Sequence, residues 1–220
     1  MSQRREARAR RRASESSRDL SGGLDFTGRM HAFCTDITQR LDEYRHVDMS
    51  RVAVTFSQAR KMVTYGVYAT TTPMRFEGGR LTQMRNGRLM TFQRLFDPRG
   101  LETMYVISFY LPRFLNIDYR EKLITVFHEL WHISPTFNGD LRRHPGRCYA
   151  HTGSQKSYDA LMAEFVDRYL SLDPPDDLFG FLRLGFAELR RKHGSIHGVR
   201  IPHPKLIPVR EPDAIRAAGA

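Results

Sequence analysis

The sequence predicts an α+β fold in which helices pack on a mainly antiparallel sheet of three to four strands. Apolar residues recur at helical spacing in four segments of the chain, and three shorter runs are rich in Val, Thr, Tyr and Phe. All three runs lie between the first and second helical segments. A group of strands followed by a group of helices is typical of an α+β domain.

The first half of the chain is expected to form one helix and then the strands. The helix covers about residues 25–44, and the strand-like runs are 51–57, 66–76 and 104–111. The segments EGGR and RNGR mark turns between the second and third runs. We therefore expect residues 80–91 to form a hairpin or a mobile flap.

The second half is expected to hold three helices. In the first of them, Asp118 with Glu121 fits a capping box, Asn116 is a competing N-cap, and Pro135 stops the helix. A second helix covers about residues 158–170. After the Pro174-Pro175 break, a third is expected from about residue 177 to residue 192.

The pentapeptide HELWH, residues 128–132, carries the strongest functional signal. It matches the pattern H-E-x-x-H, in which two histidines one helical turn apart bind zinc. On a helix His128 and His132 lie on one face, about 40° apart in projection. Glu129 flanks that face, where its carboxylate is placed to take a proton from water rather than to bind the metal.

The surroundings of the motif strengthen this interpretation. Apolar side chains cover about half of the helix circumference, and the polar ones fall within a narrower sector. A largely buried helix with one polar stripe needs something for that stripe to face. Two surface histidines beside a glutamate, the plainer alternative, would sit on a wider and more charged face.

A catalytic zinc site needs a third protein ligand and one open position. The metzincin pattern would place a histidine six residues after His132, where this chain has Asn138. Glu164 is a candidate on the next helix, but it projects away from the apolar stripe of that helix. The remaining candidates are His144 and His151. We favour His151, because it lies just before the helix, where a ligand is held more firmly than in mid-loop.

The stretch FHELWHISPTFNGDLRRHPGRCYAH, followed by SQKSYDALM, resembles the small zinc metallopeptidases of phage and bacterial genomes, which are SprT-like zincins in style. The shared features are the core motif and a P-x-F-x-G-x-L-R segment. In this chain that segment is formed by Pro135, Phe137, Gly139, Leu141 and Arg142. The residues PGRCYA, which separate His144 from His151, depart from the family pattern.

The resemblance covers about residues 52–170 and implies a zincin-like domain with a bound Zn²⁺ and a peptide or protein substrate. We expect this domain to extend over residues 24–198, between two terminal segments of different composition. The resemblance also implies that an exposed sheet edge beside the motif helix binds the extended substrate. Residues 104–111 are the candidate edge, and a central core strand is the alternative for this run. Glu129 would pass its proton to the leaving amine. Candidate donors to the developing oxyanion are Tyr149, Tyr158 and Arg142. Asp140 and Asp159 are candidates for orienting the ligand histidines, although exposed carboxylates are the commoner case.

The two ends of the chain differ in composition from the expected domain. Residues 1–23 are rich in arginine and poor in large apolar groups, which predicts a disordered basic arm, and residues 199–220 are expected to form a Pro-rich flexible tail. The net charge is +11. A basic arm binds nucleic acid through its phosphates without reading sequence, and a solubilising tail is the alternative.

Length and composition also suggest the compartment. The chain has no run of 18 apolar residues and no secretory signal pattern, so we expect a cytoplasmic protein with no membrane partner. Cys34 and Cys148 are expected to be unpaired, with a disulfide as the alternative. A second functional hypothesis is a nucleic-acid-associated binding protein whose metal site is structural or degenerate. It draws on the arginine-rich arm and on Arg142, Arg143 and Arg147 beside the motif.

Overall fold

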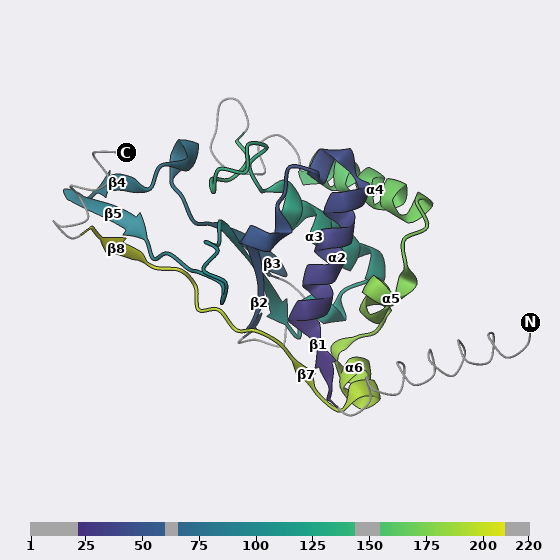
Figure 1. Cartoon of the computed structure of the whole chain (residues 1–220). Coiled ribbons are helices and arrows are strands. Elements are labelled where there is room, and N and C mark those ends of the chain that lie inside the picture. Colours follow the sequence, from purple (N-terminus) through teal and green to yellow (C-terminus); the bar gives the residue numbers. More distant parts are fainter. Residues whose placement is uncertain (1–21, 60–65, 144–154, 210–220) are drawn as a thin grey trace, which may run out of the picture.

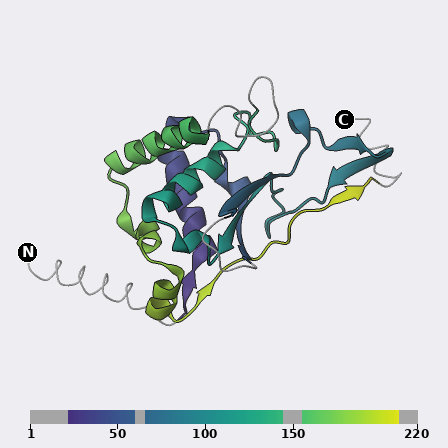
Figure 2. The ribbon, with the colours of Figure 1, turned by 180° about the vertical axis from the view of Figure 1, so that it is seen from behind.

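The α+β class is confirmed by the computed structural model of the chain, which describes residues 22–59, 66–143 and 155–209. A three-stranded central sheet carries helices on one face. A second three-stranded sheet projects from the end of the molecule that lies farthest from these helices (Figure 1). The view from behind shows the same separation (Figure 2). None of the described helices is long and apolar enough to cross a lipid bilayer.

The central sheet contains the three predicted strands in the order β2-β6-β3. They are β2 (Val52–Gln58), β6 (Tyr105–Leu111) and β3 (Ala69–Pro73). β6 runs parallel to β2 and antiparallel to β3, so the sheet is mixed, and the expected mainly antiparallel arrangement is wrong for it.

The expected edge strand is also corrected. The run 104–111 forms β6, which lies in the middle of the sheet, and β3 is the outer strand beside the motif helix. The composition of the two strands explains this order. YVISFYL is apolar along most of its length, as suits a strand with neighbours on both sides, whereas ATTTP is polar and ends in proline, as suits an edge.

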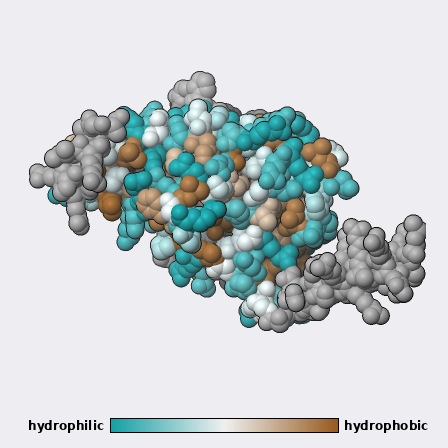
Figure 3. All heavy atoms as spheres, viewed as in Figure 1, coloured by the Kyte–Doolittle hydropathy of each residue, from teal (hydrophilic) through white to brown (hydrophobic). Residues whose placement is uncertain are grey.

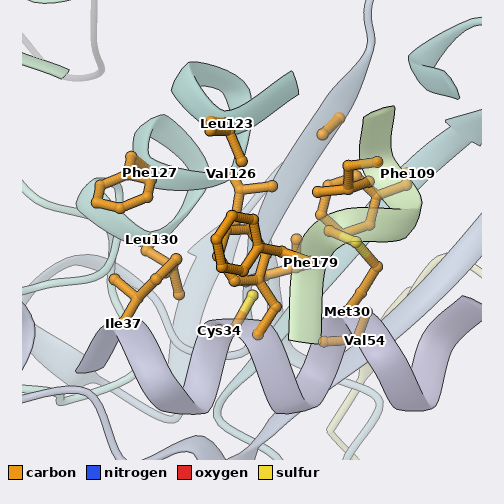
Figure 4. Close-up of a cluster of buried hydrophobic side chains, with 14 of the residues drawn as sticks. Met30, Cys34, Ile37, Val54, Phe109, Leu123, Val126, Phe127, Leu130 and Phe179 are labelled. Carbon is orange, nitrogen blue, oxygen red and sulfur yellow. The ribbon is translucent and has the colours of Figure 1, made fainter. Parts of the chain in front are cut away.

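Two of the three long helices, α2 (Phe26–Arg40) and α3 (Tyr119–Trp131), cover the central sheet, and α4 (Gln155–Ser171) packs against α3. Each of the three is close to a predicted segment. Asp25 caps α2 by accepting a hydrogen bond from the Gly28 amide. Figure 4 shows the core between α2 and α3, where Cys34, Ile37 and Leu130 lie among other buried side chains. Cys34 is a free thiol, and burial raises its pKa to about 12.

The last predicted helix is wrong as a single element. Residues 177–192 belong instead to three short pieces: α5 (Asp176–Phe179), η5 (Gly180–Arg183) and α6 (Phe186–His193). The break is stabilised by Lys122 of α3, whose buried ammonium donates to the carbonyls of Leu182 and Leu184 at 2.8 and 3.1 Å. These bonds fix the backbone at the junction of η5 and α6, where Leu184 is extended.

The predicted hairpin at residues 80–91 is confirmed as β4 (Thr82–Arg85) and β5 (Arg88–Phe92). Its two-residue turn, Asn86-Gly87, has positive φ at both positions, which matches the right-handed twist of a hairpin. The short strand β8 (Leu206–Pro208) adds to β5 as a third strand.

The start of the expected C-terminal tail is thus ordered in part. The Val199 amide binds the Thr27 hydroxyl, and the Thr55 hydroxyl binds both the Val199 carbonyl and the Ile201 amide before the chain reaches β8. Residues 1–21 of the expected arm and residues 210–220 of the expected tail lie outside the described residues. The remaining short elements are β1 (Leu24–Asp25), β7 (Ile196–His197), η1 (Asp42–Tyr44), η2 (Met49–Arg51), η3 (Glu77–Gly79) and η4 (Phe114–Asn116).

Candidate metal centre

The motif helix begins and ends near the predicted residues. Asp118 is its N-cap and accepts a hydrogen bond from the Arg120 amide at 2.8 Å. Asn116, the competing N-cap, instead accepts from the amide of Phe186 at the start of α6. His128 lies in the last turn of α3 and His132 is its C-cap, so the motif sits where the helix gives way to a loop.

The two motif imidazoles converge. Their ring centroids are 4.6 Å apart and the ring planes are inclined by 73°. Both residues are half-buried, and the ring of Tyr158 from α4 lies 5.5 Å from that of His128. Two imidazoles at this separation on one helix face can direct nitrogen atoms to a common point.

Glu129 is buried between α3 and the central sheet. The Thr71 hydroxyl on β3 lies 2.7 Å from Oε2 of Glu129 and 2.8 Å from its backbone carbonyl oxygen. Burial raises the pKa of the Glu129 carboxyl to about 7, and the hydrogen bonds from Thr71 oppose that rise. The carboxyl group is thus held in one place and titrates near neutrality.

The loop that follows α3 returns immediately against the end of the helix. Ile133 forms a β-bridge with Leu141, and the Arg142 amide donates to the His132 carbonyl at 2.7 Å. The guanidinium of Arg142 donates to the Trp131 carbonyl and stacks over the Trp131 ring, 3.7 Å from its centroid. This loop therefore fixes the helix end that carries His132.

The P-x-F-x-G-x-L-R segment has a structural explanation in this loop. Phe137 and Gly139 both have positive φ, and the Phe137 ring packs 5.2 Å from the ring of Tyr105. The buried Tyr105 hydroxyl accepts from the Gly139 amide at 2.9 Å and donates to the Asp140 carbonyl at 2.8 Å. The Tyr105 side chain on the central strand β6 thereby holds the backbone of the loop in place.

Asp140, a candidate for orienting the ligand histidines, has other partners. Its buried carboxylate accepts hydrogen bonds from the amides of Gly78 and Leu141 and from the Arg143 guanidinium. Arg143 also lies 3.5 Å from a carboxylate oxygen of Glu77. Asp140 therefore joins the loop to η3 at the root of the hairpin. The side chain of Asp159, the other candidate, lies outside the described residues.

The three candidate oxyanion donors differ in their surroundings. Tyr158 lies beside His128, and burial raises the pKa of its hydroxyl. The guanidinium of Arg142 is held against Trp131. Tyr149 lies outside the described residues.

Two of the three candidates for the third metal ligand lie outside the residues that the structure describes. Glu164 is exposed on α4, as its projection predicted, while the opposite face of that helix packs toward the core. Within residues 22–59, 66–143 and 155–209, no group of three or more His, Cys, Asp or Glu side chains is arranged to hold a metal ion. The two histidine candidates, His144 and His151, lie outside those ranges, as do Arg147 and Cys148.

Two residues of the site could not be identified from the sequence. Thr71 is one of three consecutive threonines, and nothing in that run distinguishes the one that faces α3. Tyr105 reads as an ordinary apolar residue of a core strand. Register with β6 would have been the deciding signal, because Thr71 pairs with Ile107, which belongs to the hydrophobic core on the helix-covered face of the sheet.

Comparison with known proteins adds no relative. No family model matches the chain, and no match is found among curated proteins or solved structures.

Proposed function

We propose that this chain is a zinc-dependent metallopeptidase with a zincin-like domain, SprT-like in style, that hydrolyses peptide bonds. The observation that carries the proposal is the convergence of the His128 and His132 imidazoles, 4.6 Å apart, beside the buried carboxyl group of Glu129. Burying an acid costs stability, which the single side-chain donor Thr71 offsets only in part, and hydrolysis would use the acid and both imidazoles together.

The residues present suit a zinc ion. Imidazole nitrogens are common zinc ligands, and two of them from one helical turn supply half of a tetrahedral set. His151 is the favoured third ligand and His144 is the alternative. When bound, zinc would supply a Lewis acid that lowers the pKa of water and polarises the scissile carbonyl.

The chain's own groups have separate roles in this proposal. Glu129 accepts a proton from the attacking water and delivers it to the leaving amine. Thr71 holds the Glu129 carboxyl group in position through its hydroxyl. Tyr158, the described oxyanion candidate beside His128, donates a hydrogen bond to the developing negative charge.

The outer edge of β3 offers a binding strip for an extended peptide. Tyr68 and Met74 bond to β6 through their backbones, so the alternate residues Ala69, Thr71 and Pro73 direct their backbone groups away from β6. Pro73 offers only its carbonyl, and the Thr71 amide faces the Glu129 carboxyl group. A substrate strand that paired with these groups would lie beside α3. The same strand would then orient both substrate and proton acceptor.

The proposal is tested by Glu129→Gln in zinc-loaded protein, with cleavage of fluorescein-labelled casein as the readout. Zinc content and fold are expected to be unchanged, and cleavage is expected to fall by at least about a hundredfold, since general base catalysis contributes that much or more. Glu164→Gln, an exposed glutamate on the neighbouring helix, is the matched control and should retain wild-type cleavage. Equal cleavage by wild type and Glu129→Gln would refute the role of Glu129 as proton acceptor. Absence of cleavage by the zinc-loaded wild type would favour a binding protein with a structural metal site.

A further inference from the structure

The second sheet, formed by β4, β5 and β8, stands apart from the protein core. None of its strand residues is buried, and Met84 and Ile207 on one face are 61% and 41% exposed. Figure 3 shows apolar patches among hydrophilic ones at this end of the molecule. A three-stranded sheet usually buries at least one face, so the exposure of this one points to a role in binding.

The base of this sheet is tied to the body of the protein by several contacts. The rings of Phe76 and Phe92 pack with centroids 4.9 Å apart. Glu102 forms ion pairs with Arg75 at 2.6 Å and with Arg94 at 2.7 Å. Together with the bond from Gly78 to Asp140, these contacts hold the projecting hairpin in a set direction relative to the loop after α3.

The sheet and its connections are strongly basic. Residues 78–96 and 198–209 contain six arginines and lysines and no aspartate or glutamate. Arg94 is neutralised by Glu102. Among the described residues, no carboxylate pairs with the exposed Arg80, Arg85, Arg88 or Lys205.

Two of these cations face each other at the tip. Arg85 and Arg88 flank the Asn86-Gly87 turn and are directly opposite in the β4–β5 register, so they lie on the same face. Like charges directly opposite on adjacent strands destabilise a hairpin. Arg85 also lies over the Phe76 ring, with 5.7 Å between the guanidinium carbon and the ring centroid. An anion received between the two guanidinium groups would relieve their repulsion.

We propose that the β4–β5 hairpin, extended by β8, is a docking surface for the phosphodiester backbone of double-stranded nucleic acid, with Arg85 and Arg88 as its principal phosphate ligands. One guanidinium group can bind two phosphate oxygens at once, and the tip of the hairpin, beyond the residues paired with β8, is a two-stranded ribbon of a width that a major groove admits. Arg80 and Lys205 add sequence-independent attraction along the sheet. This surface differs from the N-terminal arm and does not depend on hydrolysis at the candidate metal centre.

The contacts at the base of the hairpin also set the direction of the docking surface. A duplex bound at the tip would be held in a set direction relative to the loop that follows α3, because Asp140 and Glu102 tie the hairpin to the body of the protein.

The test uses the full chain and a fluorescein-labelled 20-base-pair duplex of mixed sequence, titrated from 50 to 300 mM KCl. Arg85→Gln/Arg88→Gln is compared with Arg190→Gln/Arg191→Gln, an equal loss of charge on exposed residues of α6 at the other end of the molecule. The hairpin variant should bind at least about tenfold more weakly at 100 mM KCl, and the slope of log K against log salt should fall by about 1.8, or 0.9 for each lost phosphate contact. The α6 variant should bind within about twofold of wild type.

Two further measurements distinguish loss of phosphate contacts from other causes of weaker binding. Arg85→Lys/Arg88→Lys retains the charge and should restore most of the binding, which separates lost phosphate contacts from lost structure. Vesicles of phosphatidylserine and phosphatidylcholine test the other anionic surface that cations and exposed apolar groups would suit. Equal weakening by the hairpin and α6 variants, or loss of vesicle binding with duplex binding unchanged, would overturn the proposal.

Discussion

The Thr71 hydroxyl lies 2.7 Å from Oε2 of Glu129 and 2.8 Å from the carbonyl oxygen of the same residue. One side chain of the edge strand thus contacts both the backbone and the side chain of the proposed proton acceptor. Because Thr71 also belongs to the strand proposed to bind substrate, the orientation of the carboxyl group and that of the peptide are linked through one residue.

Thr71→Val keeps the shape of the side chain and removes its hydroxyl. We expect unfolding free energy to fall by about 1–2 kcal/mol, because Glu129 loses a buried hydrogen-bond donor. Cleavage of labelled casein should fall by about tenfold or more, since small displacements of a catalytic group cost rate steeply. Urea denaturation and initial-rate measurements on zinc-loaded protein check the two effects.

Thr70→Val is the control, because Thr70 lies on the other face of β3 and makes only a 3.5 Å contact with the Tyr110 hydroxyl. Thr71→Ser restores the hydroxyl and should recover most of the activity. Equal activity in the Thr70 and Thr71 valine variants would show that the hydroxyl does not position Glu129.

Gly139→Ala is expected to destabilise the loop after α3. Gly139 has φ of +87°, and an added Cβ would lie 2.5 Å from Cγ of Arg75 and 2.9 Å from Cε of Met104. Positive φ alone costs alanine about 1 kcal/mol, and the clash adds about 1–3 kcal/mol. Thermal unfolding should therefore shift to lower temperature by several degrees.

Gly78→Ala separates these two costs. Gly78 also has positive φ, +70°, but an added Cβ there meets nothing within 4 Å. Gly78→Ala should therefore lose only the free energy that positive φ costs an alanine, about 1 kcal/mol. If both variants were equally stable, the close packing of Gly139 against Arg75 would be contradicted.

Much of the fold could be predicted from periodicity and turn residues. Helix α3 with its Asp118 cap, the Asn86-Gly87 hairpin and the three central strands are all local features, and local patterns predict them well. Strand order and direction are not local. The position of β6 between β2 and β3 depends on which strands share hydrogen bonds across the sheet, and the sequence reveals that only indirectly.

The site shows the same division. The spacing of His128 and His132 fixes their common face, because helix geometry does so for any helix. The partner of Glu129 comes from a strand 58 residues earlier, and its identity depends on register. The junction between η5 and α6 likewise contacts a distant group, the ammonium of Lys122, that no local pattern indicates.

Glu102 predicts a pH-dependent stability. Its hydrogen bond with Arg94, followed by that with Arg75, lowers the pKa of its carboxyl from 4.5 to about 2. A folded-state pKa below the unfolded value means that the carboxylate stabilises the protein above about pH 4.5, and that this contribution is lost as pH falls toward 2. Glu102→Gln should therefore lower unfolding free energy by about 2 kcal/mol at pH 7.

Urea denaturation of wild type and Glu102→Gln at pH 7, 5 and 3.5 measures this contribution. The difference between the two proteins should be similar at pH 7 and 5 and smaller at pH 3.5. Asp42→Asn removes a carboxylate whose ion pair with Arg45 is highly exposed, and serves as a control with little expected effect at any of these pH values. A difference that stayed constant down to pH 3.5 would rule out the ion pairs as the source of the stability.

The most direct test of the central claim is the zinc content of purified protein, measured by elemental analysis after loading and removal of free metal. We predict about one zinc per wild-type chain, with loss of the ion in His128→Ala and in His132→Ala but not in the matched surface variant His203→Ala. His151→Ala and His144→Ala, measured beside them, identify the third ligand. Wild-type protein that retains no zinc, or motif variants that retain it fully, would contradict the account.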